Sequence, residues 1–222
     1  MSAVRTRVKI CGITREEDAL AAAHAGADAI GLVFWPHSPR AVDPVRARAI
    51  AVATPPFVAK VGLFVDPTAD DVHAVLAVVP LDLLQFHGSE SPAACRAFDR
   101  PYLKAIAMRD ELDLLDSASG YGDAVGLLVD TFRRGDLPGG TGHTFDWSRL
   151  TPDVRRRLQA PLVLSGGLDP RNVGAAIRAV QPWAVDVSSG VEERDSAGAP
   201  RRGIKDAARI AAFMEGVRRA DA

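Results

Sequence analysis

The chain has 222 residues, of which 47% are hydrophobic, 25% are charged and only 6% are aromatic, and its formal net charge is −1. This size and composition are typical of one domain with a full hydrophobic core, so we expect residues 1–222 to form a single domain. The near-zero charge gives no electrostatic basis for binding nucleic acid or a membrane surface. In addition, no apolar run reaches the roughly 18 residues of a membrane span.

The amino terminus and the cysteines predict a cytoplasmic location. Residues 1–7 lack the apolar stretch of a secretory signal. Cys11 and Cys95 are too few for a disulfide framework, which is typical of proteins from a reducing compartment. We therefore expect a cytoplasmic protein that has neither a nucleic-acid nor a membrane partner.

Apolar runs of strand length alternate with helical patterns along the chain. The runs are near-continuously apolar, as expected of parallel strands buried on both faces. Strands are predicted over Val8–Ile10, Ala29–Phe34, Val58–Phe64, Leu83–Phe86, Tyr102–Ala107, Ala124–Val129, Leu162–Leu164 and Ala184–Val187. Helices are predicted over Glu16–Ala25, Pro44–Val52, Asp70–Val78, Ser91–Phe98, Glu111–Ser117, Trp147–Leu158, Asn172–Ala179 and Lys205–Ala220.

Local signals refine some of these elements. Thr14 followed by Glu17 predicts a capping box at the start of the first helix. Pro44 stands where the first turn of a helix tolerates proline. The polar segment 194–203 is rich in Gly and Pro and is predicted to be a surface loop before the last helix.

The alternation of elements predicts the fold class. Eight strand–helix units in this length average about 28 residues each, a normal size for the unit. We therefore predict an α/β fold in which eight parallel strands close a (β/α)₈ TIM barrel, with the active site at their carboxyl ends. The alternative is an open doubly wound sheet, which would carry a Gly-rich dinucleotide fingerprint after the first strand. Cys11-Gly12-Ile13-Thr14 is not that fingerprint.

Two glycine-rich loops follow the last two predicted strands. They contain Gly166 and Gly167 after one strand, and Ser189 and Gly190 after the next. Glycine lets the backbone approach a phosphate closely, and barrels often bind phosphate with these two loops. Tight turns alone would also explain the glycines, but their paired position favours a phosphate site.

Cys11 and Asp130 are the candidates for acid–base chemistry, because each ends a predicted strand. A cysteine thiolate is a competent base when a cation or a helix amino terminus stabilises it. A desolvated aspartic acid is able to donate a proton near neutral pH. The alternatives are that Cys11 is a small core residue and that Asp130 belongs to a turn. No spacing of His and Cys predicts a metal site.

Further candidates follow other strands. Arg40 ends the loop after the second strand, and its guanidinium suits a carboxylate, although most arginines simply lie on the surface. His87 and Asp66 either line the pocket or support residues that do. The Gly-rich run that ends at Gly142 is a candidate lid. We count His87 and Gly142 among the expected substrate-binding residues.

Motifs along nearly the whole chain closely resemble the phosphoribosylanthranilate isomerase family of tryptophan biosynthesis. They occur in the family's order, and together they are far more specific than any one of them. The matching segments are residues 9–14 (KICGIT), 38–40 (SPR), 61–65 (VGLFV), 84–88 (LQFHG), 128–131 (LVDT), 139–142 (GGTG), 145–147 (FDW), 165–168 (SGGL) and 186–192 (DVSSGVE). One departure is the segment between residues 192 and 203, which is longer than the family's usual link.

The resemblance implies an isomerase of the aldose–ketose type that works without a cofactor or a metal. Its substrate would be N-(5-phosphoribosyl)anthranilate and its product 1-(o-carboxyphenylamino)-1-deoxyribulose 5-phosphate, formed by an Amadori rearrangement. By motif, Cys11 would be the general base, Asp130 the general acid and Arg40 the group that holds the anthranilate carboxylate. The phosphate would lie among Gly166, Gly167, Ser189 and Gly190. The enzyme would be a monomer or a homodimer with a small-molecule substrate.

Two other functions stay open at this point. One is the histidine-pathway isomerase, which performs the same rearrangement on a bisphosphate; it usually carries a carboxylate at the position of Cys11 and needs two phosphate sites. The other is a barrel that binds a phosphosugar or a protein without catalysis. Such a barrel would have little use for both Cys11 and Asp130.

Overall fold

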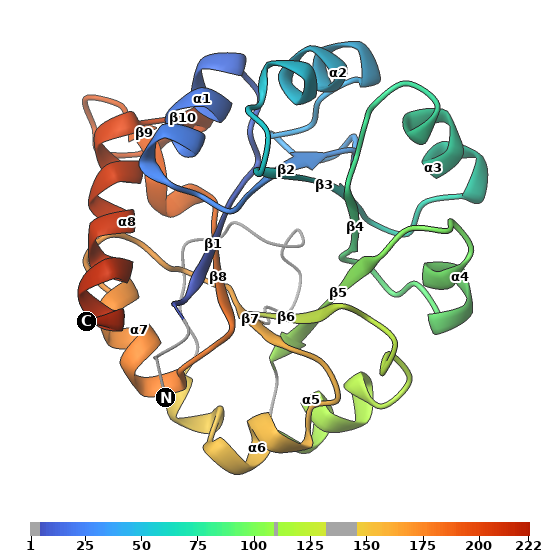
Figure 1. Cartoon of the computed structure of the whole chain (residues 1–222), viewed down its shortest axis with the longest axis vertical. Helices are drawn as coiled ribbons and strands as arrows, with labels where there is room; N and C mark the ends of the chain where they lie inside the picture. The colour runs from blue at the N-terminus through green and yellow to red at the C-terminus, as the bar shows by residue number, and fades with distance from the viewer. Residues whose placement is uncertain (1–4, 109–110, 132–145) are drawn as a thin grey trace.

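Eight parallel strands close into a barrel in the computed structural model, which describes residues 5–108, 111–131 and 146–222 (Figure 1). Each strand pairs with the next along the chain, and β8 pairs with β1. The strands are β1 (Arg7–Cys11), β2 (Ala29–Val33), β3 (Ala59–Phe64), β4 (Leu83–Phe86), β5 (Tyr102–Met108), β6 (Gly126–Thr131), β7 (Leu162–Leu164) and β8 (Ala184–Val187). The predicted (β/α)₈ barrel is confirmed.

The helices form a ring outside the barrel (Figure 1). They are α1 (Glu16–Ala25), α2 (Pro44–Ala53), α3 (Ala69–Leu76), α4 (Pro92–Arg96), α5 (Glu111–Ala118), α6 (Pro152–Arg157), α7 (Val173–Val180) and α8 (Ala207–Asp221). Two short 3₁₀ helices, η1 (Trp147–Arg149) and η2 (Ser189–Val191), precede α6 and follow β8. None of the helices described is long and apolar enough to cross a bilayer.

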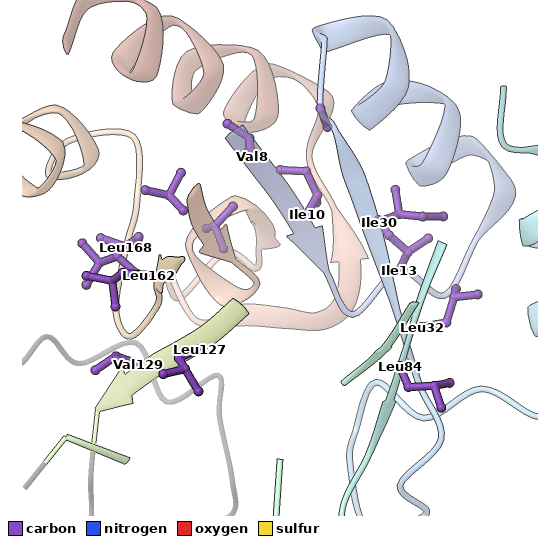
Figure 2. Close-up of a cluster of buried hydrophobic side chains, with 14 of the residues drawn as sticks. Val8, Ile10, Ile13, Ile30, Leu32, Leu84, Leu127, Val129, Leu162 and Leu168 are labelled. Atoms are coloured by element: carbon purple, nitrogen blue, oxygen red, sulfur yellow. The ribbon is translucent and has the colours of Figure 1, made fainter. Parts of the chain in front are cut away.

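The main core lies between the strands and the helices, because successive strand residues point to opposite faces. On β1, Val8 and Ile10 point outward into this core, together with Ile30 and Leu32 of β2 (Figure 2). The same cluster continues around the barrel through Leu127 and further strand residues. Burial on both faces explains why the strands read as continuous apolar runs.

The interior of the barrel changes from apolar to polar along its axis. Its apolar layer consists of Val61, Leu103, Ala105, Leu128, Val163 and Ala184. Toward the carboxyl ends of the strands, the buried side chains of Lys9, Gln85 and Asp186 accompany a smaller apolar cluster of Cys11, Val33 and Leu63. Buried charge is costly unless it is paired, so this polar end of the barrel is the place to look for function.

The predicted capping box at Thr14 and Glu17 is wrong. The residue that caps α1 is Arg15, and it makes no side-chain capping bond. The Thr14 hydroxyl instead donates a 2.5 Å hydrogen bond to the carbonyl of Gly203. The Thr14 hydroxyl, which the local pattern assigned to the helix as an acceptor, therefore bonds to a distant strand instead.

The predicted surface loop over residues 194–203 is also wrong, because most of it belongs to an antiparallel hairpin. Its strands are β9 (Glu192–Arg194) and β10 (Pro200–Lys205). Lys205 consequently ends a strand, and α8 begins only after Asp206, whose side chain accepts hydrogen bonds from the first turn. The predicted helix Trp147–Leu158 likewise divides into η1 and α6, because Thr151 caps a new helix there.

Candidate functional site

The predicted site residues lie at the carboxyl ends of the strands, where the barrel interior is polar. Gly142 and the rest of the predicted lid lie outside the described residues. The other predicted residues fall into four groups around this end of the barrel: Cys11; Asp130 with His87; Arg40; and the two loops that contain Gly166, Gly167, Ser189 and Gly190.

Cys11 ends β1 and points into the barrel beside Lys9, which lies two residues earlier on the same face of the strand. Lys9 Nζ forms a 2.6 Å ion pair with Asp186 Oδ1 on β8, and its charge acts on the nearby thiol. Burial raises the pKa of the Cys11 thiol, while the Lys9 ammonium opposes that rise. Burial lowers the pKa of Lys9, but Asp186 and Cys11 outweigh it and hold this pKa above its ordinary value. A charged lysine is thus held where it stabilises the thiolate.

Asp130 lies on β6 with its carboxylate buried against the loops after β4 and β7. Its Oδ1 accepts a 2.7 Å hydrogen bond from the backbone N–H of Thr131, and its Oδ2 lies 3.5 Å from His87 Nε2. The side-chain amide of Gln85 donates a 2.9 Å hydrogen bond to His87 Nδ1. Neutral His87 therefore carries its proton on Nε2, the nitrogen that faces Asp130.

Arg40 is buried and forms a two-bond ion pair with Glu192. Its Nε and Nη2 atoms lie 2.6 Å and 3.0 Å from the two carboxylate oxygens. Lys205 Nζ lies 3.3 Å from the same carboxylate and donates a 3.0 Å hydrogen bond to the carbonyl of Ser188. Burial alone would raise the pKa of Glu192, but Arg40 and Lys205 hold it below its ordinary value. Burial lowers the pKa of Lys205 to about 8 against the opposing charge of Glu192.

The glycine-rich loops after β7 and β8 touch one another. Gly166 and Gly167 have φ values of 86° and 62°, which few other residues adopt. A Cβ atom on Gly190 would lie only 1.9 Å from the carbonyl oxygen of Leu168, so the two loops meet backbone to backbone. Ser189 begins η2 directly after β8. The loops therefore present main chain, rather than bulky side chains, at this side of the barrel.

Asp66 joins the loops after β3 and β4. Its Oδ1 accepts a 2.6 Å hydrogen bond from the backbone N–H of Ser89, while its own N–H donates to Glu90 Oε1 at 2.8 Å. Glu90 is buried and forms a 2.7 Å ion pair with Lys104. Asp66 thereby links the loop after β3 to the loop that carries His87.

The sequence patterns gave no role to Lys9, Asp186, Glu192 or Lys205. The alternation of side chains along a strand was a usable signal for Lys9, because it places this lysine on the same face as Cys11. Nothing local marks the pairing of Glu192 with Arg40, which lie far apart in the chain.

The site combines proton donors, proton acceptors and fixed charges. Within the described ranges, no three His, Cys, Asp or Glu side chains come together in a way that could hold a metal ion. A buried thiol beside an ammonium, and a carboxylate beside a histidine, are suited to moving protons. Buried cations and glycine-rich main chain are suited to binding an anionic substrate.

Comparison with known proteins agrees with this chemistry. Residues 8–216 match the family model described as N-(5'-phosphoribosyl)anthranilate (PRA) isomerase. Among curated relatives, the N-(5'-phosphoribosyl)anthranilate isomerase of Alcanivorax borkumensis is 55% identical over 212 residues, which cover 96% of this chain and 95% of the relative.

Solved structures show the same relationship. A phosphoribosyl anthranilate isomerase in complex with reduced 1-(o-carboxyphenylamino)-1-deoxyribulose 5-phosphate is 41% identical, with a TM-score of 0.82 over 96% of this chain and 98% of that chain. A structure of monomers of the dimeric Thermotoga maritima enzyme is 40% identical, with a TM-score of 0.81 over the same shares of the two chains. The chain therefore belongs to the N-(5'-phosphoribosyl)anthranilate isomerase family.

Proposed function

We propose that this chain converts N-(5'-phosphoribosyl)anthranilate into 1-(o-carboxyphenylamino)-1-deoxyribulose 5-phosphate, a step of tryptophan biosynthesis. The observation that carries this proposal is the pair of proton-transfer groups at one end of the barrel. A buried thiol beside an ammonium lies on β1, and a buried carboxylate beside a histidine lies on β6. An Amadori rearrangement needs one acid and one base.

Asp130 is the general acid in this proposal. It protonates the ring oxygen of the ribose, so that the furanose opens and the anthranilate nitrogen forms an iminium ion with C1. The Nε2–H of His87 faces Asp130 Oδ2 at 3.5 Å and holds the carboxyl group toward the substrate. Because the acid acts at the ring oxygen, its contribution belongs to the transition state.

Cys11 is the general base. The iminium ion acidifies the proton on C2, so a thiolate is strong enough to remove it and form an enolamine, which then tautomerises to the ketone. Burial disfavours the thiolate and keeps the pKa of Cys11 above its ordinary value, while the Lys9 ammonium opposes this rise by stabilising the negative charge. The pair Lys9–Asp186 thus supports the base from inside the barrel.

The two anionic ends of the substrate are bound on either side of the reacting carbons. Arg40 holds the anthranilate carboxylate, and the phosphate lies against the main chain of Gly166, Gly167, Ser189 and Gly190. The buried guanidinium of Arg40 supports the first assignment, and the close approach of the glycine backbones supports the second. Fixing both ends places C1 and C2 between the acid and the base, which lowers the entropic part of the barrier.

Removal of each proton-transfer group tests the proposal. We expect Cys11→Ala and Asp130→Asn each to lower kcat by several orders of magnitude while substrate binding changes little. Cys95→Ala is the matched control, because Cys95 is buried in α4 and burial raises the pKa of its thiol to about 11. Near-normal turnover by Cys11→Ala, or strong loss in Cys95→Ala, would overturn the assignment.

We also propose that residues 1–222 form one domain that pairs with a second copy. Phe57 follows two prolines and is fully exposed at a φ of 70°. Phenylalanine is enriched at protein–protein interfaces, and the Thermotoga maritima relative is described as dimeric. Light scattering would show a dimer for the native chain and a monomer for Phe57→Asn, since asparagine tolerates this φ; a native monomer would refute the pairing.

The cysteines support a proposed cytoplasmic location. Both are free and buried, and Cys11 acts as a base only while it stays a reduced thiol. Fractionation of the source cells should recover the enzyme with cytoplasmic markers. Recovery outside the cytoplasm would contradict this.

A further inference from the structure

The hairpin of β9 and β10 carries two buried charges toward the site. Glu192 begins β9 and Lys205 ends β10, and they are directly paired across the two strands. Both side chains are fully buried, whereas neighbouring hairpin residues such as Arg194 and Arg201 are exposed. A solvated hairpin therefore has one buried, charged end.

That end is fastened to the loops after β1 and β2. Gly203 accepts a 2.5 Å hydrogen bond from the Thr14 hydroxyl, and its backbone N–H donates a 2.9 Å bond to Glu192 Oε1. A Cβ atom on Gly203 would lie 3.5 Å from the carbonyl oxygen of Pro39, the residue before Arg40. The hairpin thus packs on the loop that delivers Arg40.

Glu192 fixes the orientation of the Arg40 guanidinium. The Glu192 carboxylate accepts hydrogen bonds from Nε and Nη2 of Arg40 at 2.6 Å and 3.0 Å. The stem of Arg40 crosses Gly12, where a Cβ atom would lie 2.5 Å from Arg40 Cδ. Within the described part of the chain, no residue accepts a hydrogen bond from Nη1, so the outer edge of the fork is left to a ligand.

The charges of this cluster do not cancel. Arg40 and Lys205 share one carboxylate, so the cluster has one positive charge in excess while Lys205 is protonated. Lys205 is itself satisfied by Glu192 and by the carbonyl of Ser188. The uncompensated charge is therefore available at the outer edge of Arg40, where an anion would neutralise it.

We propose that Glu192 and Lys205 are positioning residues that hold Arg40 with its outer edge toward the carboxylate of the arylamine substrate, and so determine selectivity for a carboxylated substrate. The proposal rests on the proposed role of Arg40. Buried ion pairs contribute little net stability compared with apolar packing, so a geometric role is the better account of three buried charges.

The test compares two substrates, N-(5'-phosphoribosyl)anthranilate and the aniline analogue that lacks the carboxylate. Glu192→Gln keeps the shape but removes the charge that holds Arg40. We expect it to raise KM for the anthranilate substrate about tenfold to a hundredfold, and to leave kcat and KM for the aniline analogue close to native. Glu193→Gln is the matched control, since this neighbouring carboxylate pairs with Arg201 at the surface. The Glu193→Gln control should discriminate between the two substrates as strongly as the native enzyme does.

Each outcome decides a different point. If Arg40→Lys loses discrimination and Glu192→Gln retains it, the positioning role is refuted while the role of Arg40 stands. If Arg40→Lys also retains discrimination, the proposed role of Arg40 fails, and the positioning role with it. Should Glu192→Gln not fold, Lys205→Met replaces it, because it removes the excess charge but keeps the pair of Arg40 and Glu192. A KM that rises for the anthranilate substrate alone supports the proposal, and an equal rise for both substrates refutes it.

Discussion

A substitution at Gly31 on β2 tests the proposed role of Cys11 as the general base, because the two residues are direct partners in the sheet. A Cβ atom on Gly31 would lie 2.7 Å from the Cys11 sulfur and 3.1 Å from its Cα. Non-bonded heavy atoms prefer separations of about 3.5–4.0 Å, so Gly31→Ala must displace the thiol by roughly 1 Å. A displacement of that size at a reacting group costs about 100-fold in rate. Overpacking also costs about 1–3 kcal/mol of stability.

Gly62→Ala on β3 separates the two effects. There a Cβ atom would lie 2.5 Å from Leu81 Cδ1, in the core outside the barrel and away from the thiol. We expect both variants to lose stability in urea unfolding, but only Gly31→Ala to lose kcat in an assay that follows anthranilate fluorescence. If Gly31→Ala turned over as fast as Gly62→Ala, Cys11 could not be the base that its position implies.

Three further predictions address the surrounding charges and loops. Lys9→Met should lower kcat/KM at pH 7 and shift the rise of kcat/KM with pH to higher pH, because burial raises the pKa of Cys11 and the opposing ammonium is gone. An unshifted pH profile would contradict the role of Lys9. The pKa of Lys205, which faces Glu192, Arg40 and Cys11, is about 8. KM for the carboxylated substrate should therefore rise between pH 7 and 9 as Lys205 loses its charge, and a KM that stays constant over this range would contradict the prediction. Gly190→Ala places a Cβ atom 1.9 Å from a carbonyl oxygen of the loop after β7, so it should raise KM far more than it changes kcat; an unchanged KM would remove the phosphate from these loops.

Local patterns were sufficient for most of the barrel. Burial of each strand on two faces requires continuous apolar runs, and these runs marked all eight strands to within a few residues. The starts of α1 at Glu16 and α2 at Pro44 were predicted correctly, but the capping box of α1 was not. Asp43 before Pro44 caps α2 through its side chain, whereas the Thr14 hydroxyl bonds to the distant Gly203 and leaves α1 without a side-chain cap.

The candidate site likewise contains residues that the sequence could place and residues that it could not. The position of Cys11 and Asp130 at the carboxyl ends of β1 and β6 was predictable from the sequence, because barrels gather these strand ends and position along a strand is enough to place such residues. The support for these groups was not found. Lys9 lies beside Cys11 on β1, and it is paired there by Asp186 of the last strand, a contact that exists only because β8 closes onto β1.

The sequence by itself determined the order of strands and helices, the closure of the barrel and the identity of the residues at the strand ends. These follow from side-chain periodicity and from the short range of backbone preferences. The tertiary structure decided which charges meet. Arg40 and Glu192 are separated by 152 residues, and such a pairing depends on the packing of the hairpin against the loops after β1 and β2. No local propensity encodes that contact, because the desolvation that makes it strong arises only when the whole barrel has closed.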